Sequence, residues 1–416
     1  MIIGIAGLSH LGLVTAAGLA EKGFQIVAWD PNTINDEGLS AGNMNMSEPQ
    51  LTELLSKNTN NIKFVSSCSE LKIADLVYIA SDTPTDNTNS SDLLLVSKII
   101  NDVLTCLEKD AVLVILSQVP PGFTESINFP SSRLFYQVET LVLGEALSRF
   151  LNPERFIIGC DNPKKETHPI LNEILEKFDC PILNMSYKSA ELAKIAINSI
   201  LTSQVSTANM LSALCEKIGA NWAEIVPALQ LDKRIGRNAY LKPGLGLAGG
   251  NLERDLNILD NLTTQHKIEN TQIKAWLKTS EIQKNWLYRK FSSLDLDKQQ
   301  DSKIAILGLT YKENTNSIKN SSSIEFLNQV QGHKVWVHDP VVKLIDMPWL
   351  HQVEDATEAI EKADVLIVAT PWPEYKHLQL EKLHSMMKRP IIIDPLSLFL
   401  KQNPEQYGFK WIRLGV

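Results

Sequence analysis

The chain opens with an alternation of apolar and polar segments that predicts a strand, a turn, a helix and a second strand. An apolar run in "MIIGIA" ends at Gly7, and an Ala- and Leu-rich amphipathic stretch follows it. After Gly23 the run "FQIVAWD" is apolar again and ends in Asp30. Two buried strands on either side of a helix are the first βαβ unit of a doubly wound α/β fold.

Three later apolar runs predict further strands: "ADLVYIASDTPT", "DAVLVILSQVPPGFTE" and "RFIIGC". The first two end in small polar or proline-rich turns. In a parallel sheet such carboxyl ends face the ligand crevice, so we expect Thr83, Pro84 and Ser117 to line it. Ser117 alternatively has only a turn role.

Residues 187–219 carry one long helical pattern, "YKSAELAKIAINSILTSQVSTANMLSALCEKIGA", in which apolar residues recur at intervals of three and four. No proline interrupts it, and Gly219 suits a helix C-cap. Lys194 and Asn198 are four residues apart and therefore share a face. A helix of this length is a candidate dimer spine.

The last third restarts the opening pattern. Strand, Gly308, loop, helix and strand lead to Asp339, and "ADVLIVATPW" and "RPIIIDP" are further buried strands. We predict an α/β fold of two Rossmann-like doubly wound domains joined by a long central helix. The expected domains are 1–186, 187–295 and 296–416.

Composition narrows the range of possible binding partners and compartments. The net charge of -8 argues against a general nucleic-acid binder, which needs a basic face. Five scattered cysteines without metal-ligand spacing fit a reducing compartment and no structural zinc. The N-terminus lacks a basic segment, so we expect no signal peptide, and no apolar run approaches the roughly 20 residues of a membrane span. We therefore expect a cytosolic protein without a membrane partner.

The opening βαβ unit predicts a dinucleotide cofactor. Gly7 makes the turn, Gly12 allows close packing, and the helix N-terminus faces a pyrophosphate. Asp30 stands where an acid accepts from ribose hydroxyls and repels a 2′-phosphate, which favours NAD over NADP. Ser9 occupies the position of a further fingerprint glycine, where its hydroxyl could donate to phosphate. The alternative is a βαβ unit that binds nothing. The turn that we assign to the cofactor comprises Gly7, Ser9, His10, Leu11 and Gly12.

Several segments in collinear order resemble motifs of the UDP-glucose/GDP-mannose dehydrogenase family. They are "GLSHLG", "SEPQLTELL", "DTPT", "SQVPPGFTE", "NPERFIIG", "ELAKIAINSI", "LDKRIG", "GLAGGNLERD", "LGLTYKENTNSIKNS" and "DP". The resemblance covers nearly the whole chain. It implies an N-terminal NAD domain, a central helix that forms a homodimer, and a C-terminal domain that holds a nucleotide sugar. Family members oxidise a primary alcohol to a carboxylate and reduce two NAD.

The resemblance also implies roles for single residues. Lys194 and Asn198 match residues that polarise the sugar oxygen and hold the oxyanion. Asp255 matches an aspartate that, with a water, removes the hydroxyl proton, and Glu139 matches an active-site glutamate. The substrate-binding matches are Arg234, which reaches the partner subunit's substrate, Tyr240, Gly249 and Lys312. Arg254 and Lys319 stand where the family has basic residues near NAD.

Departures from the family pattern are as informative. The catalytic cysteine falls at Asn251, a second glutamate becomes Leu143, and a threonine near the nicotinamide becomes Gln118. A proline is replaced by Glu253, and the arginine of a C-terminal "DxR" motif by Leu396. Tyr240 sits one residue farther from Gly236 than is usual.

Loss of the thiol limits the chemistry. Oxidation of an alcohol needs a base, an alkoxide stabiliser and a hydride acceptor, which Asp255, Lys194, Asn198 and NAD supply. Oxidation of the resulting aldehyde needs a covalent adduct that Asn251 cannot form. Cys160, Cys180 and Cys215 lie outside the glycine-rich loop. We expect one two-electron oxidation to a ketone or 6-aldehyde. The alternatives are a uronic acid made through a hydrated aldehyde, an inactive nucleotide-sugar-binding paralogue, and an unrelated substrate such as a hydroxy acid.

Overall fold

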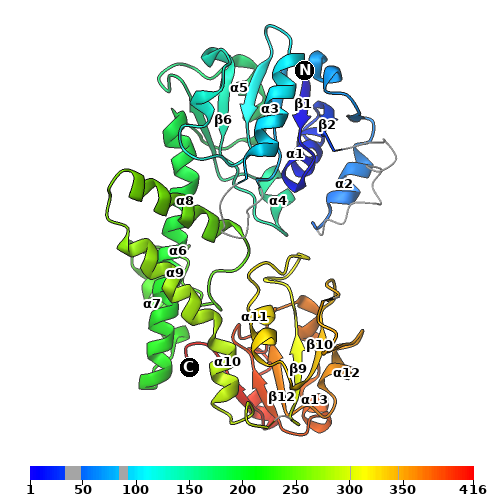
Figure 1. Cartoon of the computed structure of the whole chain (residues 1–416), viewed down its shortest axis with the longest axis vertical. Coiled ribbons are helices and arrows are strands. Elements are labelled where there is room, and N and C mark those ends of the chain that lie inside the picture. The colour runs from blue at the N-terminus through cyan, green and yellow to red at the C-terminus, as the bar shows by residue number, and fades with distance from the viewer. Residues whose placement is uncertain (33–47, 84–91, 300, 345) are drawn as a thin grey trace. The chain divides into compact units, whose positions relative to one another are not determined.

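The computed structural model describes residues 1–32, 48–83, 92–299, 301–344 and 346–416, and Figure 1 shows its ribbon. The chain divides into two compact units, Met1–Ile197 and Asn198–Val416. No helix in the described part of the chain has the length and apolar character that a membrane crossing requires.

The first unit is built on an eight-stranded sheet with the strand order β3-β2-β1-β4-β5-β6-β7-β8. Neighbouring strands run parallel except β6 and β7, which are antiparallel. The first six strands therefore follow the Rossmann order 3-2-1-4-5-6. The strands are β1 (Ile2–Ala6), β2 (Gln25–Trp29), β3 (Ile62–Val65), β4 (Leu76–Ile79), β5 (Val112–Ile115), β6 (Leu134–Gln137), β7 (Phe156–Cys160) and β8 (Ile182–Ser186).

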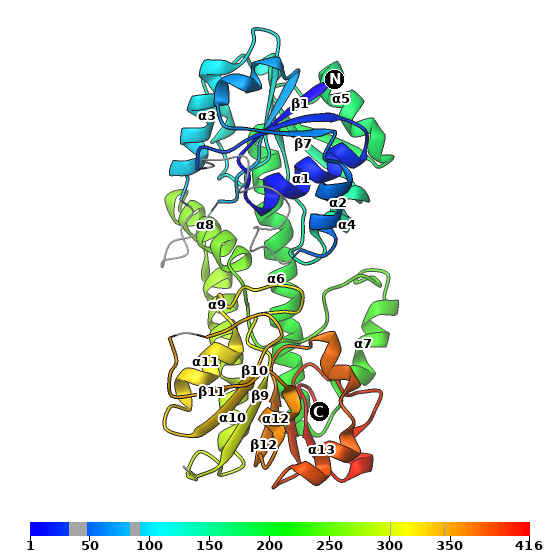
Figure 2. The same cartoon turned by 90° about the vertical axis from the view of Figure 1, so that its right-hand side faces the viewer.

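Helices cover both faces of this sheet, as a doubly wound fold requires. One apolar cluster joins α1 and α5 to the strands, and a second joins η2 and α3 to the opposite face. Figure 2 shows α3 and α5 on the two sides of the sheet. The helices are α1 (His10–Glu21), α2 (Leu51–Lys57), η2 (Cys68–Ile73), α3 (Leu94–Cys106), η3 (Thr124–Ser126), η4 (Ser131–Arg133), α4 (Ala146–Leu151), α5 (Pro169–Leu175) and η5 (Glu176–Phe178).

The long helix predicted for residues 187–219 is confirmed. Helix α6 spans Tyr187–Ile218, and Gly219 follows it with φ of +74°. The N–H groups of Gly219 and Ala220 both donate to the carbonyl of Cys215, which closes the last turn.

The second unit contains the remaining helices and a six-stranded sheet, β11-β10-β9-β12-β13-β14, that is parallel throughout. Its order repeats that of the first six strands of the first unit, so the predicted second Rossmann-like fold is confirmed. Its strands are β9 (Lys303–Leu307), β10 (Lys334–His338), β11 (His351–Gln352), β12 (Val365–Val368), β13 (Ile391–Ile393) and β14 (Lys410–Ile412). Its helices are α7 (Trp222–Leu231), α8 (Asn251–Gln265), α9 (Thr271–Lys284), α10 (Trp286–Ser292), α11 (Ser322–Gln329), α12 (Ala356–Ile360), η6 (Pro373–His377), α13 (Leu380–Met386) and η7 (Pro404–Tyr407).

The three-part division at 186/187 and 295/296 stays a prediction. Trp286, Leu287 and Phe291 of α10 share one apolar cluster with Ile304 and Ile306 of β9. The packing of the second Rossmann-like fold thus begins before residue 296.

Both sheets close their first turn with the same contact. The N–H of Leu8 donates to Asp30 Oδ2 at 2.8 Å, and the N–H of Leu309 donates to Asp339 Oδ2 at 2.6 Å. Asp339 is buried and also accepts from three further backbone N–H groups and from the indole of Trp372. The internal repetition expected from sequence therefore extends to a carboxylate contact.

Candidate active site

The turn between β1 and α1 has no room for a side chain at two positions. Gly7 has φ of +98°, and a Cβ there would lie 2.8 Å from the backbone nitrogen of Ser81. A Cβ on Gly12 would lie 1.9 Å from the carbonyl oxygen of Gly7. Glycine is therefore required at both positions, and it brings the N-terminus of α1 to the carboxyl edge of the sheet. This cradle fits the pyrophosphate of a dinucleotide.

Residues at the start of α1 are bonded to neighbouring loops. Ser9 Oγ accepts from the N–H of Asp82 at 2.7 Å, and the N–H of Leu11 donates to Asp82 Oδ2 at 3.4 Å. His10 Nε2 lies 2.9 Å from Glu48 Oε2. The Ser9 hydroxyl is thus engaged within the protein, and its contact with a phosphate stays a prediction.

Asp30 is held in place at the end of β2. Its Oδ2 accepts from Leu8 N–H and its Oδ1 accepts from Asn32 N–H, both at 2.8 Å. A carboxylate oxygen accepts more than one hydrogen bond, so these contacts orient the group while leaving acceptor capacity for ribose hydroxyls.

Asp30→Ala is expected to weaken NAD binding roughly 10-fold, because hydrogen bonds to a charged group contribute about 1.5–3 kcal/mol. Removing the negative charge also relaxes the exclusion of NADP. Titration of both cofactors measures the two effects, and thermal unfolding checks the fold. Asp110→Ala, at an exposed position before β5, is the matched control. An unchanged NAD-to-NADP preference would remove Asp30 from the ribose site.

The turns after β4 and β5 are joined by side-chain hydroxyls. Thr83 Oγ1 donates to the carbonyl of Gln118 at 2.8 Å, and Ser117 Oγ donates to the carbonyl of Ser81 at 2.6 Å. Ser117 is fully buried, so its clearest role is to fix these two turns together. Pro84 lies outside the described residues. The assignment of Thr83, Ser117 and Gln118 to the cofactor site stays a prediction.

Glu139 and Lys194 form a partly buried ion pair beyond the carboxyl end of β6. Lys194 Nζ lies 3.0 Å from Glu139 Oε2 and donates to the Glu139 carbonyl at 2.8 Å. Glu139 Oε1 accepts from the N–H of Leu141, which fixes the carboxylate from its other side. The structure thus brings together the lysine and the glutamate that sequence analysis assigned to catalysis.

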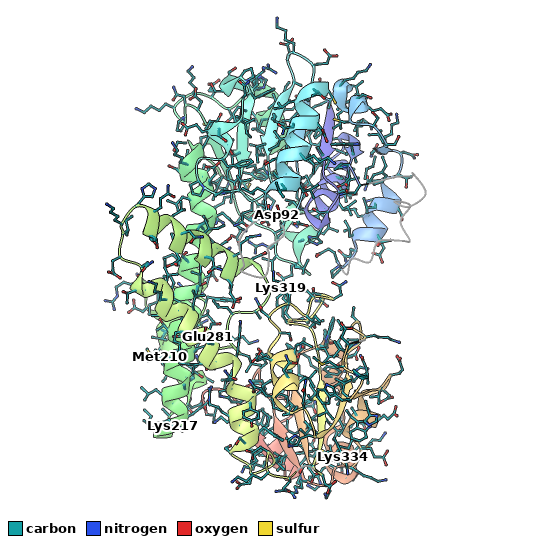
Figure 3. All side chains as sticks on the ribbon, viewed as in Figure 1. Asp92, Met210, Lys217, Glu281, Lys319 and Lys334 are labelled. Carbon is teal, nitrogen blue, oxygen red and sulfur yellow. The ribbon has the colours of Figure 1, made fainter. Side chains whose placement is uncertain are left out.

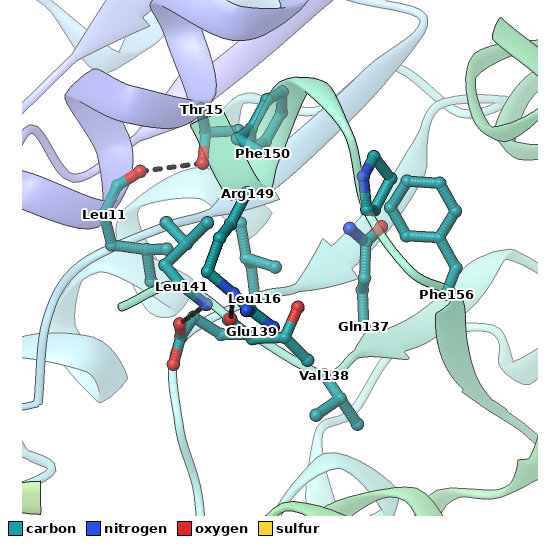
Figure 4. A pocket seen from close by; sticks show the side chains of 12 residues that line it. Leu11, Thr15, Leu116, Gln137, Val138, Glu139, Leu141, Arg149, Phe150 and Phe156 are labelled. Carbon is teal, nitrogen blue, oxygen red and sulfur yellow. Dashed lines mark hydrogen bonds between the residues drawn. The ribbon is translucent and has the colours of Figure 1, made fainter. Parts of the chain in front are cut away.

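A cavity of about 30 Å³ adjoins Glu139 in the first unit (Figure 4). It has room for a water molecule and is far too small for a nucleotide sugar. The cavity is therefore not the substrate site. Its lining residues are Leu11, Thr15, Leu116, Gln137, Val138, Glu139, Thr140, Leu141, Arg149, Phe150, Pro153 and Phe156.

The glycine-rich loop of the second unit, residues 246–250, leads into α8. Asn251 is the first residue of this helix and is exposed, whereas Asp255, one turn later, is fully buried. Asp255 Oδ2 lies 2.5 Å from Asn198 Nδ2 of α6, and Oδ1 lies 3.1 Å from Arg254 Nε. The candidate base and one candidate oxyanion stabiliser are thus in direct contact, and the base is also paired with Arg254.

The carboxamide of Asn198 and the ammonium of Lys194 come from one helix. Both residues lie in α6, and positions four apart project from the same face one turn apart. Helix geometry therefore gives the two proposed stabilisers of a developing alkoxide a common scaffold.

Gly249 and Lys319 meet in the second unit. The N–H of Gly249 donates to the carbonyl of Lys319 at 3.0 Å, and a Cβ on Gly249 would lie 3.2 Å from the Tyr311 ring. The side chain of Lys319 runs past Gly250, whose added Cβ would be 3.4 Å from Lys319 Cδ. The loop that carries candidate basic residues thus packs on the glycine-rich loop.

The other predicted substrate residues lie at more open positions. Arg234 is paired with Asp232 at 2.6 Å, although its side chain is 88% exposed. Tyr240 is 49% exposed, and Lys312 Nζ lies 5.7 Å from the centre of the Tyr311 ring. Their contacts with substrate stay predictions.

Comparison with known proteins decides the family. Three sequence models of the UDP-glucose/GDP-mannose dehydrogenase family match, namely the NAD-binding domain at residues 1–179, the central domain at 188–281 and the UDP-binding domain at 305–400. The chain is 30% identical to the UDP-glucose 6-dehydrogenase of Rickettsia conorii, over 100% of this chain and 99% of that protein. The chain belongs to the UDP-glucose/GDP-mannose dehydrogenase family.

Other relatives agree with this assignment. Identity with UDP-glucose 6-dehydrogenase TuaD of Bacillus subtilis is 29%, over 99% of this chain and 93% of that protein. The structure of a UDP-glucose dehydrogenase from Pyrobaculum islandicum superposes with a TM-score of 0.86 at 26% identity, over 100% of this chain and 97% of the other. The protein is accordingly an NAD-dependent oxidoreductase that acts on nucleotide sugars.

Each of the three cysteines considered from sequence lies apart from the candidate site residues of its own unit. Cys160 ends β7, which runs against β6, so it emerges at the sheet edge opposite Glu139. Cys180 precedes β8, five strand spacings or about 24 Å from β1. Cys215 lies about 25 Å along α6 from Asn198. Burial raises the pKa of both Cys160 and Cys180, which keeps them as unreactive thiols.

Two buried glutamates that sequence analysis did not single out position the candidate site of this dehydrogenase. Glu48 accepts from the N–H groups of Gly144 and Ala146, both at 2.8 Å, and thereby holds the segment after Glu139. Glu191 in α6 is fully buried and accepts from Gly122 N–H at 2.5 Å and from Thr124 N–H at 2.8 Å. Glu48 lies in the motif "SEPQLTELL", which was the only sequence signal for it.

Proposed function

We propose that this dehydrogenase oxidises one hydroxyl of a UDP-sugar by a single two-electron step and stops at the carbonyl. The feature that carries the proposal is Asn251, which the resemblance of "GLAGGNLERD" to the family motif puts at the position of the nucleophilic cysteine. The match to the family's UDP-binding domain and the relatives named UDP-glucose 6-dehydrogenase support a UDP-sugar.

Asp255 is the proposed base, acting through a water. Asn198 binds one of its carboxylate oxygens and Arg254 binds the other, and these two contacts hold the orientation of the group. A carboxylate oxygen can accept more than one hydrogen bond, so the same group can take a proton from a bound water. Its complete burial limits exchange with bulk solvent. Geometry therefore supports general-base catalysis by a fixed carboxylate.

Lys194 and Asn198 are the proposed stabilisers of the alkoxide that forms as the proton leaves. An ammonium and a carboxamide in a water-poor site stabilise developing negative charge far better than they do in water. NAD, when bound, supplies the hydride acceptor, and the residues proposed to hold it are those of the Gly7–Gly12 turn, Asp30 and the turns at Thr83 and Ser117.

The reaction ends at the carbonyl because a carbonyl carbon gives up a hydride only after a nucleophile has added to it. A cysteine thiolate makes that adduct, whereas the side chain of Asn251 can only form hydrogen bonds. Without the thiol, the alcohol loses one hydride and one proton.

Counting NADH per sugar consumed tests this proposal. Purified protein is incubated with NAD and a panel of UDP-, GDP- and dTDP-sugars, and mass spectrometry identifies the product. One NADH with a carbonyl product is the expected result. Two NADH and an acid would show that a hydrated aldehyde is oxidised without a thiol. A UDP-sugar that binds without reducing NAD would indicate a binding protein instead.

We also propose that the protein is a homodimer through α6. Four apolar side chains of this helix recur at helical spacing and are more than half exposed, namely Ile200, Met210, Leu214 and Ile218. Figure 3 labels Met210 on the helix. An apolar stripe of this length on a helix surface typically packs against a partner. The exposed Arg234 is then available to reach the partner's substrate.

Leu214→Glu is expected to convert the dimer to a monomer, because it places a charge in the centre of the apolar stripe. Sedimentation equilibrium of wild type and variant measures the change. Lys217→Glu, a neighbouring exposed position, is the control for a change of charge alone. A monomeric wild type, or a variant that stays dimeric, would remove α6 from the interface.

A further inference from the structure

The side chain of Glu253 joins three segments of the second unit, namely α8, the end of α9 and the loop at Asn320. We call this set of contacts the junction. Glu253 Oε1 lies 2.6 Å from Lys284 Nζ at the end of α9, and Glu253 Oε2 accepts from Asn320 Nδ2 at 2.6 Å. The Glu253 and Lys284 side chains are only 12% and 20% exposed. Such shielding distinguishes this ion pair from the exposed pairs of the surface, which contribute little.

Asn320 extends the junction to the glycine-rich loop. Its Nδ2 donates to the carbonyl of Gly249 at 2.7 Å as well as to Glu253, so both amide hydrogens are used. Asn320 has φ of +53°, a conformation that asparagine tolerates better than most residues. Together with the bond from Gly249 N–H to Lys319, consecutive residues of one loop bind both peptide groups of a single glycine.

We propose that Glu253 is a positioning residue that fixes the loop bearing Lys312 and Lys319 relative to the first turn of α8, and that it thereby sets the affinity for the nucleotide of the substrate. The assignment rests on the proposed function, because it takes this loop as part of the UDP site. The first turn of α8 carries Asn251 and Asp255, so the same junction links the nucleotide end of the site to its reacting end.

Only a carboxylate satisfies both donors at this position. Lys284 and Asn320 each offer an N–H to a different oxygen of Glu253. A glutamine has one acceptor oxygen, and its NH₂ would face one of the two donors. A proline, which the family has here, has no side-chain acceptor. Glu253→Gln therefore preserves shape and helix while it disrupts the junction.

The test measures UDP binding by calorimetry on the full-length protein. Glu253→Gln is expected to weaken the affinity for UDP roughly 10-fold, or about 1.4 kcal/mol, because the loop that carries Lys312 and Lys319 is no longer held. NAD affinity is measured beside it and is expected to fall as well, because Lys319 on the same loop is assigned to the cofactor. The matched control is Glu281→Gln on α9, whose partner Lys278 lies one turn away and whose side chain is 66% exposed. Figure 3 labels Glu281.

A double-mutant cycle with Asn320→Ala separates positioning from a general loss of stability. If Glu253 acts through Asn320, adding Glu253→Gln to Asn320→Ala is expected to change UDP affinity by less than about 2-fold. Full additivity, or wild-type UDP affinity in Glu253→Gln, would overturn the inference. Binding of UDP needs no turnover. If the double-mutant cycle gives the expected UDP affinities but the protein never forms NADH, the inference stands and the proposed reaction is overturned. A wild-type protein that does not bind UDP would overturn both.

Discussion

Asn251→Cys is expected to raise the yield from one NADH per sugar to two. The thiol would stand at the first position of α8, a 15-residue helix, and a helix N-terminus lowers the pKa of a cysteine and favours its thiolate. Addition of that thiolate to an aldehyde gives an adduct that still carries a hydride on the same carbon. The second oxidation then becomes possible with Asp255 and its partners unchanged.

The number of NADH formed per sugar consumed and the mass of the product together measure this effect. Asn251→Ser is the matched control, because a hydroxyl of similar size is a far weaker nucleophile at neutral pH. The experiment also reports which carbon reacts. A ketone, formed from a secondary alcohol, gives a thiol adduct with no hydride to lose. A cysteine variant that still yields one NADH would contradict the prediction and would point to a secondary alcohol or to a thiol that does not reach the carbonyl.

Asp255→Asn is expected to lower turnover by roughly 10²–10⁴-fold, the usual contribution of a general base. The substitution keeps the size of the side chain and an acceptor for Asn198 while it removes the ability to take a proton. Binding of NAD and UDP is expected to change little. Single-turnover formation of NADH gives the rate of the chemical step.

Asp260→Asn provides the control for this variant, because Asp260 lies on the same helix and binds Asn270 at 2.7 Å. A modest change in melting temperature in both variants would exclude unfolding as the cause of the loss. Turnover of Asp255→Asn within about 3-fold of wild type would assign the base to another group.

The elements that position the site were predictable wherever a segment was long or a glycine was obligatory. Helix α6 repeats its apolar positions over 32 residues, and Gly7 and Gly308 end strands with positive φ. The apolar repeat and the glycines are both local in sequence, so they can be recognised without knowledge of the fold. Asn198, Asp255 and the loop at Asn251 followed from the family resemblance, and the structure brings the first two into contact.

Features that depend on distant neighbours were not predictable. Strand β11 has two residues, too few for any periodicity, and nothing in "RFIIGC" indicates that β7 reverses direction beside β6. Glu48, Glu191 and Glu253 bind donors 31 to 98 positions away, so their roles become visible only after folding. A buried acid of this kind has the same local pattern as a solvated one.

The shared carboxylate contact at the two first turns has a consequence for how the protein sorts its ligands. NAD and a UDP-sugar both contain a ribose and a diphosphate, and the sheet of the second unit repeats the order of the first six strands of the first unit. Asp30 keeps room for ribose hydroxyls, whereas Asp339 is surrounded by four backbone N–H groups and an indole. Asp339 therefore has less acceptor capacity left for the ribose hydroxyls of an adenosine than Asp30 has, so we expect the cofactor to prefer the first unit.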